Sequence, residues 1–302
     1  MFRILKIYWP LIILITLYTA YFSVTSILRY KYYYSGIFDL GHMTQVMWTT
    51  INGPFFTETD PAGTGLLVSR LTDHADFILI LIAPIYAIFS SPEFLLILQS
   101  LIIALGAIPV FQFAKEKTES KFLPIFFACI YLLLPSVQNP NLADFHGVTL
   151  SMTFIAFAFY FLYKKKFKWG SVFVVLSLIC KEQIGFTLSF MFLYFLFQNV
   201  KGKKIFISLK ATFLEKKNEN IFLMLGFILC LAYSFIMILV IIPNLRGSGS
   251  IYLNYYDGSG EGLGGILKTV IENPVNVVNS HYDGTVKYSG DLLFPVAGQS
   301  IF

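Results

Sequence analysis

Six apolar segments in this chain are long enough, or nearly long enough, to cross a lipid bilayer as helices. A transmembrane helix needs about 20 mostly apolar residues, because the hydrocarbon core is about 30 Å thick. The segments are Ile7–Leu28, Phe94–Ala114, Phe122–Val137, Val148–Tyr163, Ser171–Phe197 and Ile221–Ile242. Only 13% of the 302 residues are charged, against about 25% in soluble domains. The sequence therefore predicts an all-α, polytopic integral membrane protein.

Two apolar stretches do not fit a simple count of spans. Phe77–Ser90 has only fourteen residues, which is short for a span, and Lys181-Glu182 interrupts the segment 171–197. Each of these stretches could cross the membrane fully or only in part. The positive-inside rule, by which Lys and Arg gather on the cytoplasmic side, decides between these topologies. All lysine-rich loops fall in the cytoplasm only if 77–90 lies along the outer interface as an interfacial helix. The stretches 171–180 and 184–197 then form a hairpin.

On this topology the N-terminus is cytoplasmic, the first span is an uncleaved one, and the protein lies in the plasma membrane. The cytoplasmic side holds fifteen Lys/Arg and four acidic residues, and the outer side holds seven Lys/Arg and thirteen acidic residues. Membrane topology thus explains the net charge of +5, and we expect no nucleic-acid partner. Every Asp and every His falls on the outer side, where we therefore expect a functional site.

The predicted membrane domain covers residues 1–243, and residues 244–302 form an outer segment rich in Gly, Tyr and Asn. This segment ends in the mostly apolar run Leu292–Phe302, with no polar tail.

The first outer loop contains Asp39 and, one turn later, His42. Asp is a preferred helix N-cap, so Asp39 suits the start of a short helix that ends at Asn52-Gly53. Asp39 is also a candidate catalytic base at the membrane surface, and His42 would then touch the same site. The two roles can coexist, and both stay open at this point.

Two further clusters, Asp73-His74-Ala75-Asp76 and Asp144-Phe145-His146, lie beside the starts of apolar helices. Their simplest interpretation is helix capping and interfacial anchoring, and the alternative is substrate binding. Two His and several carboxylates could hold a divalent cation. However, residues two apart do not share a helix face, and no established metal-binding spacing occurs. The sequence therefore assigns no metal ligand and no firm cofactor.

Lys181-Glu182 is the strongest single signal for a site. A charge at the bilayer centre costs about 2.5–3.5 kcal/mol even on lenient insertion scales. Neighbouring helical residues point about 100° apart, so the two side chains cannot simply neutralise each other. A hairpin turn that opens to the outer surface would break the helix at this point and would bring both charges out of the bilayer centre. The plain interpretation is a lysine that reaches the interface, and the functional one is a site for an anionic group such as a lipid phosphate.

The order of short motifs along the chain is distinctive. These are Phe38-Asp-Leu-Gly41 with Gln45 and Trp48, then His74, Leu81–Tyr86, Gln99, Ala107–Pro109, Asp144–His146 and Lys181-Glu182. Over residues 30–300 this order resembles the uncharacterised membrane family catalogued as domain of unknown function 2079 (DUF2079). That family in turn resembles the GT-C glycosyltransferases, which use polyprenyl-phosphate sugars.

The resemblance implies a GT-C-like helical bundle that transfers a sugar from a polyprenyl-phosphate donor to an acceptor on the non-cytoplasmic face. In GT-C proteins the first outer loop carries an acidic catalytic residue, which corresponds here to Asp39. The implied substrate-binding residues are His42, His74, Asp76, Asp144, His146, Lys181 and Glu182. The expected partners are the donor lipid and membrane lipids. In the resembling family the stretch that corresponds to 292–302 leads into another membrane helix, so the resemblance also implies a chain truncated before further spans.

Two other classes of function fit the same composition. A membrane transporter or lipid carrier would use Lys181 and Glu182 in a substrate pathway, and it predicts inverted repeats or paired broken helices, which the sequence does not show. A non-catalytic membrane assembly subunit would keep the scaffold and tolerate the loss of Asp39 and Lys181.

Overall fold

The computed structural model describes residues 2–35, 37–61, 63–198, 217–247 and 271. The chain divides into two compact units, Met1–Leu245 and Arg246–Phe302. Almost all of the second unit, and with it most of the predicted outer segment 244–302, lies outside the described residues. The described part of the first unit is helical except for one short two-stranded hairpin.

The elements follow one another along the chain in a simple order. The first are α1 (Phe2–Lys31), α2 (Ile37–Asn52), the antiparallel strands β1 (Thr57–Thr59) and β2 (Leu67–Ser69), a 3₁₀ turn (Arg70–Thr72) and α3 (Ile78–Tyr86). Next come α4 (Pro92–Leu105), α5 (Ala107–Lys117), α6 (Leu123–Leu133), α7 (Pro135–Leu142), α8 (Gly147–Tyr163), α9 (Phe167–Leu178) and α10 (Ile184–Gln198). The last are α12 (Lys217–Ile236), a π-helical turn (Met237–Ile241) and α13 (Ile242–Arg246).

Three of the described helical segments are long and apolar enough to cross a membrane. They are Tyr8–Lys31, Pro92–Lys117 and Asn218–Arg246, and the bent pair of α6 and α7 gives a fourth. Large apolar side chains on these segments face outward, as contact with lipid requires: Leu17 is 63% exposed and Leu229 is 65% exposed. The structure therefore confirms the predicted all-α, polytopic membrane fold.

The predicted span 122–137 is not one straight helix. α6 ends at Leu133 and α7 begins at Pro135, with a bend of 46° between them. Leu134 has an extended backbone (φ −62°, ψ 129°), because the ring of a following proline disfavours the helical conformation. The structure therefore places a bend inside the predicted span, after which α7 leads toward Asp144, and the membrane boundary at Val137 stays a prediction.

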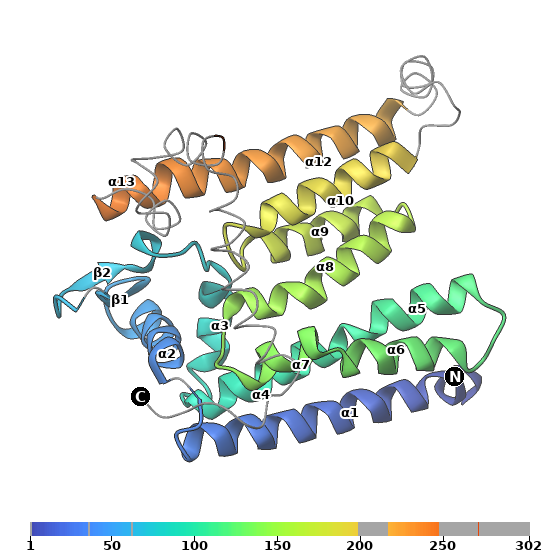
Figure 1. The fold of residues 1–302 in the computed structure, drawn as a ribbon, viewed down its shortest axis with the longest axis horizontal. Coiled ribbons are helices and arrows are strands. Elements are labelled where there is room, and N and C mark those ends of the chain that lie inside the picture. The colour runs from blue at the N-terminus through green and yellow to red at the C-terminus, as the bar shows by residue number, and fades with distance from the viewer. Residues whose placement is uncertain (1, 36, 62, 199–216, 248–270, 272–302) are drawn as a thin grey trace. The chain divides into compact units, whose positions relative to one another are not determined.

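The two ends of the helical bundle carry different loops (Figure 1). The N-terminal end of α1 lies at the same end as the α5–α6 and α8–α9 turns, which hold the lysine-rich stretches 115–121 and 164–168. The opposite end carries α2, the β-hairpin, α3 and the break between α9 and α10. The lysine-rich loops and the candidate site residues thus lie at opposite ends, as the predicted topology requires. Which end faces the cytoplasm stays a prediction.

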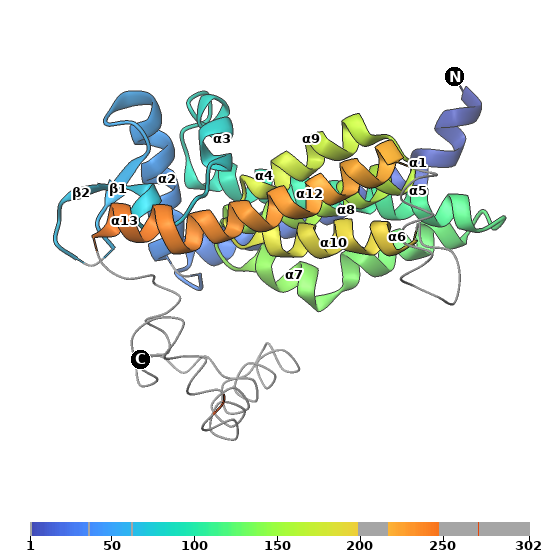
Figure 2. The same ribbon diagram turned by 90° about the horizontal axis from the view of Figure 1, so that it is seen from above.

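α2 and α3 lie across the long helices rather than along them (Figures 1 and 2). α3 has nine residues, which makes it about 14 Å long, less than half of the hydrocarbon thickness. It ends at Tyr86, four residues before the end of the apolar stretch 77–90. Ile82 on α3 is buried and Leu81 is exposed, so the helix has one face on the protein and one face outward. Its placement along the outer interface stays a prediction.

A buried apolar cluster fixes α2 and α3 on the end of the bundle. Its members include Leu40, Met43, Val46 and Met47 of α2, Ile78, Leu79 and Ile82 of α3, Leu95 and Leu96 of α4, and Phe145. Phe145 is fully buried between its neighbours Asp144 and His146, so it anchors the loop before α8. The backbone N–H of Ile78 also donates to the carbonyl of Ile179 (2.8 Å), which joins the start of α3 to the end of α9.

The α9–α10 helices break between Leu178 and Ile184, around Lys181 and Glu182. The hydroxyl of Ser234 on α12 donates to the backbone carbonyl of Glu182 (2.6 Å). Gly185 lies three residues later, in the first turn of α10, and a side chain there would clash with the backbone of Cys230 and with Ser234. Because Gly185 has no side chain, α12 can pack closely against the break between α9 and α10, and Ser234 can form its hydrogen bond to Glu182.

Candidate functional site

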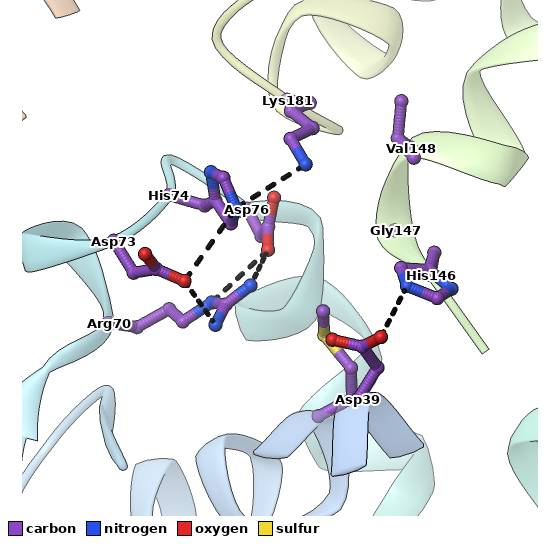
Figure 3. Close-up of a pocket in the computed structure, with 10 residues that line it drawn as sticks. Asp39, Arg70, Asp73, His74, Asp76, His146, Gly147, Val148 and Lys181 are labelled. Atoms are coloured by element: carbon purple, nitrogen blue, oxygen red, sulfur yellow. Dashed lines mark hydrogen bonds and ion pairs between the residues drawn. The ribbon is translucent and has the colours of Figure 1, made fainter. Parts of the chain in front are cut away.

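A small pocket lies at the end of the bundle that carries α2 and α3 (Figure 3). Its volume of about 80 Å³ leaves room for a few water molecules or one small polar group. The lining residues are Asp39 and Met43 from α2, Arg70, Asp73, His74 and Asp76 before α3, His146, Gly147 and Val148 at the start of α8, and Lys181. Five of the eight predicted site residues are among them, although they lie far apart in the sequence.

Asp39 and His146 face each other in this pocket (Figure 3), with 3.3 Å between Asp39 Oδ2 and His146 Nε2. α2 begins at Ile37, so Asp39 lies in the first helical turn and is not the N-cap that one interpretation predicted. A carboxylate in the first turn still interacts favourably with the helix dipole. The Asp39 side chain is 52% exposed, so it can contact a bound molecule.

This ion pair shifts the pKa values of both partners. The hydrogen bond with His146 lowers the pKa of Asp39 below its ordinary value of 3.8, although burial opposes the shift. Burial alone would lower the pKa of His146, but the hydrogen bond and charge of Asp39 outweigh it and raise that pKa above 6.5. Between these two values the pair consists of a carboxylate and an imidazolium.

The two shifts predict a pH window in which the pair stabilises the fold. His146 has a raised pKa in the folded state, so its contribution is complete below pH 6.5 and is lost as the pH rises through the folded value. Asp39 has a lowered pKa, so its contribution is present above pH 3.8 and is lost as the pH falls through the folded value. We expect Asp39→Asn to lower the pKa of His146, measured by NMR on histidine-labelled protein, with His146→Gln to assign the signal. An unchanged titration would show that the two side chains do not interact.

Lys181, His74 and Glu182 form a chain of contacts from the pocket into the protein. Lys181 Nζ lies 3.5 Å from His74 Nε2, and His74 Nδ1 lies 3.0 Å from Glu182 Oε1. The backbone N–H of Ala75 donates to Glu182 Oε2 (2.9 Å). Glu182 is fully buried, whereas Lys181 is half-buried and lines the pocket. Of this predicted pair, only Lys181 is therefore placed to contact a bound molecule.

Arg70 and Glu58, which the sequence did not single out, stabilise the acidic wall of the pocket. Arg70 donates from Nη2 and Nε to Asp76 Oδ2 (2.6 and 3.1 Å), and from Nη1 to both carboxylate oxygens of Glu58 (3.0 Å each). At most 4% of each of these three residues is exposed. Burial raises the pKa of Glu58, and the Arg70 charge opposes this shift. His42 extends the network, with its Nδ1 3.0 Å from Glu58 Oε2.

Asp73 and Asp76 are not the N-caps of the helices beside them, so the structure does not support the predicted N-capping role of this cluster. Ser69 caps the 3₁₀ turn, and the N-cap position of α3 makes no side-chain hydrogen bond. Asp73 lies 3.5 Å from Arg70 Nη1, so both carboxylates belong to the Arg70 network. A weak sequence signal existed, because Arg70 is the only Lys or Arg between Lys31 and Lys115.

Three predicted site residues do not line the pocket: His42, Asp144 and Glu182. Asp144 is 5% exposed, and its Oδ1 has no hydrogen-bond partner among the described residues. Burial raises the pKa of Asp144, and the nearby charge of Asp39 acts in the same direction. Within the described ranges, no three His, Cys, Asp or Glu side chains converge closely enough to hold a metal ion.

The chain was compared with curated proteins, with solved structures and with models of protein families. Comparison with curated proteins gave no match, and comparison with solved structures gave none either. The family model described as predicted membrane protein (DUF2079) matches residues 29–297, a range that includes every residue lining the pocket. Because this match covers far more than half of the sequence, the chain belongs to the DUF2079 family of predicted membrane proteins.

Proposed function

We propose that the chain transfers a sugar from a polyprenyl-phosphate donor to an acceptor hydroxyl on the non-cytoplasmic face of the membrane. One observation carries the proposal: the pocket places an exposed carboxylate, Asp39, and an amine, Lys181, around the same small space (Figure 3). Transfer from a phosphate uses a base for the acceptor and positive charge for the leaving group. The resemblance of the family to GT-C glycosyltransferases supports the same reaction class.

Asp39 is the proposed base. Its carboxylate accepts the proton of the acceptor hydroxyl, and the acceptor oxygen forms a bond to the anomeric carbon of the donor. The bond between that carbon and the phosphate oxygen breaks, and its electron pair stays on the phosphate. His146 keeps Asp39 ionised and fixes the direction of its carboxylate. The acceptor hydroxyl becomes more acidic as the new bond forms, so a carboxylate of lowered pKa suffices as its base.

Lys181 is the proposed partner of the leaving phosphate. His74 lies 3.5 Å from the amine and is itself held by Glu182, so the amine has a defined position. Gly147 and Val148 also line the pocket, at the start of α8. The first N–H groups of a helix lack intrahelical partners and favour anions. Both features stabilise the negative charge that develops on the phosphate.

The predicted sidedness is part of the proposal, because the donor must reach the pocket from the outer leaflet. In a background without the native cysteines, Thr64→Cys beside the pocket end should react with an impermeant thiol reagent added outside the cell. Glu119→Cys and Lys166→Cys, in the turns at the opposite end, should react only after the membrane is permeabilised. Labelling of position 119 from outside would overturn the topology and the assignment of 77–90 to the interface.

Lys181→Met tests the role assigned to the amine. A hydrogen bond to a charged group contributes about 1.5–3 kcal/mol, so donor binding should weaken about ten- to hundredfold. The measurement is the KM and Kd for a polyprenyl-phosphate sugar on purified protein in lipid. Lys31→Met is the matched control, because Lys31 is exposed at the same end of the bundle and should leave donor binding unchanged. Equal effects of the two variants would contradict the assignment.

The function itself is tested by mass spectrometry of lipids that co-purify with the protein, followed by a transfer assay with the lipid found. A polyprenyl-phosphate sugar and its turnover support the proposal. Movement of that lipid between leaflets without sugar transfer would identify a lipid carrier instead. Bound lipid with neither activity would identify a non-catalytic subunit.

A further inference from the structure

One fully buried side chain, Gln99 on α4, holds the loop that presents His146 to the pocket. Gln99 Nε2 donates to the carbonyl of Asp144 (3.2 Å) and to that of Pro140 (3.4 Å). The backbone N–H of His146 donates to Gln99 Oε1 (3.0 Å). A single amide therefore joins the end of α7 to the residues on either side of Phe145, although Gln99 itself does not line the pocket.

These contacts determine how the His146 ring is presented. His146 has an extended backbone at the N-cap position of α8, and its side chain makes no capping hydrogen bond. Its Nδ1 lies 3.3 Å from the carbonyl oxygen of Asp144, the same oxygen that Gln99 binds. A hydrogen bond at one ring nitrogen decides what the other nitrogen can do. With Nδ1 directed at this carbonyl, Nε2 is the atom that faces Asp39.

We infer that Gln99 is a positioning residue, which fixes the Asp144–His146 loop so that His146 Nε2 meets the carboxylate of Asp39. The inference deepens the proposed function, on which its kinetic part rests, because Asp39 is the proposed base. Its structural part stands on the hydrogen bonds alone. Gln99 acts through His146 and contacts no substrate.

Gln99→Met tests this role, because Met has a similar length and offers none of the three hydrogen bonds. The groups around His146 all remain in this variant: Asp39, Arg70, Asp73, His74, Asp76, Asp144 and Lys181. Without these hydrogen bonds the His146 ring is no longer fixed, so its contact with Asp39 should weaken. The effect of burial then dominates, and the pKa of His146 should fall below its wild-type value. We also expect kcat to fall about ten- to hundredfold with little change in donor KM, since misplacement of a catalytic group by 1 Å can cost about that much.

Ser100→Ala is the matched control on the next position of α4. Ser100 is fully buried and loses one hydrogen bond, to Asn141 Oδ1 of α7 (3.1 Å), while every contact of Gln99 is kept. This variant should lower stability and leave the His146 titration and kcat unchanged. A purely structural role for Gln99 would make the two variants behave alike, and that result would overturn the inference.

Two further measurements keep the test decisive. If wild-type protein shows no sugar transfer, the proposed function fails, but the NMR titration of His146 in both variants still decides whether Gln99 positions it. If Gln99→Met does not fold, amide hydrogen exchange in the wild type replaces it. The His146 N–H lies at an N-cap position, where the helix offers no partner, so slow exchange supports its bond to Gln99 and fast exchange overturns the inference.

Discussion

Asp39→Asn should lower sugar transfer by about two to four powers of ten, the usual contribution of general base catalysis. The substitution keeps the size of the side chain and removes its ability to accept a proton. Asp39 is half exposed and its ion pair with His146 is in contact with solvent, so the free energy of unfolding should change by well under about 1 kcal/mol. Turnover and denaturant unfolding would be measured in parallel on the same protein in lipid.

Asp60→Asn provides the matched control for the loss of a carboxylate from the segment between α1 and α3. Asp60 accepts a hydrogen bond from Thr64 and lies outside the pocket, so turnover should keep its wild-type value. If Asp39→Asn destabilises the protein and leaves turnover intact, Asp39 has a structural role only. The proposed transferase would then lose its base.

Arg70→Met should have the largest effect on stability of any single substitution around the pocket. Removing one partner of a buried ion pair costs about 3–5 kcal/mol, because the remaining charges stay buried without compensation. Here the substitution leaves two buried carboxylates, Glu58 and Asp76, each of which loses two hydrogen bonds. The measurement is the free energy of unfolding by denaturant in a lipid–detergent mixture. A lower midpoint concentration with an unchanged m-value would show that the substitution lowers stability.

Neutralising the two carboxylates should recover part of this loss. In the triple variant with Glu58→Gln and Asp76→Asn, no uncompensated charge remains, and stability should rise above that of Arg70→Met alone. Lys31→Met, which breaks an exposed contact of 3.9 Å with Glu93, should cost less than about 1 kcal/mol. An equally small loss for Arg70→Met would mean that the Arg70 network is not desolvated.

The membrane fold could be predicted from the sequence because a bilayer accepts few structures. In lipid the backbone N–H and C=O groups of a spanning segment have no water to bind, so they must form hydrogen bonds with one another. Long apolar runs therefore become helices. The break at Lys181 and Glu182 was also readable, since a charged pair cannot continue a buried helix without partners. The bend at Leu134 was missed although Pro135 marks it, because the apolar pattern continues across the break.

The site was predictable only in part. Asp39, His146 and Lys181 could be named because each is a polar residue beside an apolar helix, but the sequence does not state which of them meet. Arg70 was missed because its role depends on burial against Glu58 and Asp76, and neither burial nor pairing shows in composition. For the same reason the sequence could not show that Asp144 is buried and does not line the pocket.

The separations between bonded residues along the chain have a consequence for biogenesis. Arg70 lies only 12 residues from Glu58 and 6 from Asp76, so this network can close as soon as this short part of the chain has been made. Glu182 follows its partners Ala75 and His74 by 107 and 108 residues, which a ribosome takes about 5–20 s to add. During that interval His74 and Ala75 have been synthesised, but their partner Glu182 has not. The contacts of Glu182 with His74 and Ala75 can therefore form only after the break between α9 and α10 has been made, long after the Arg70 network is complete.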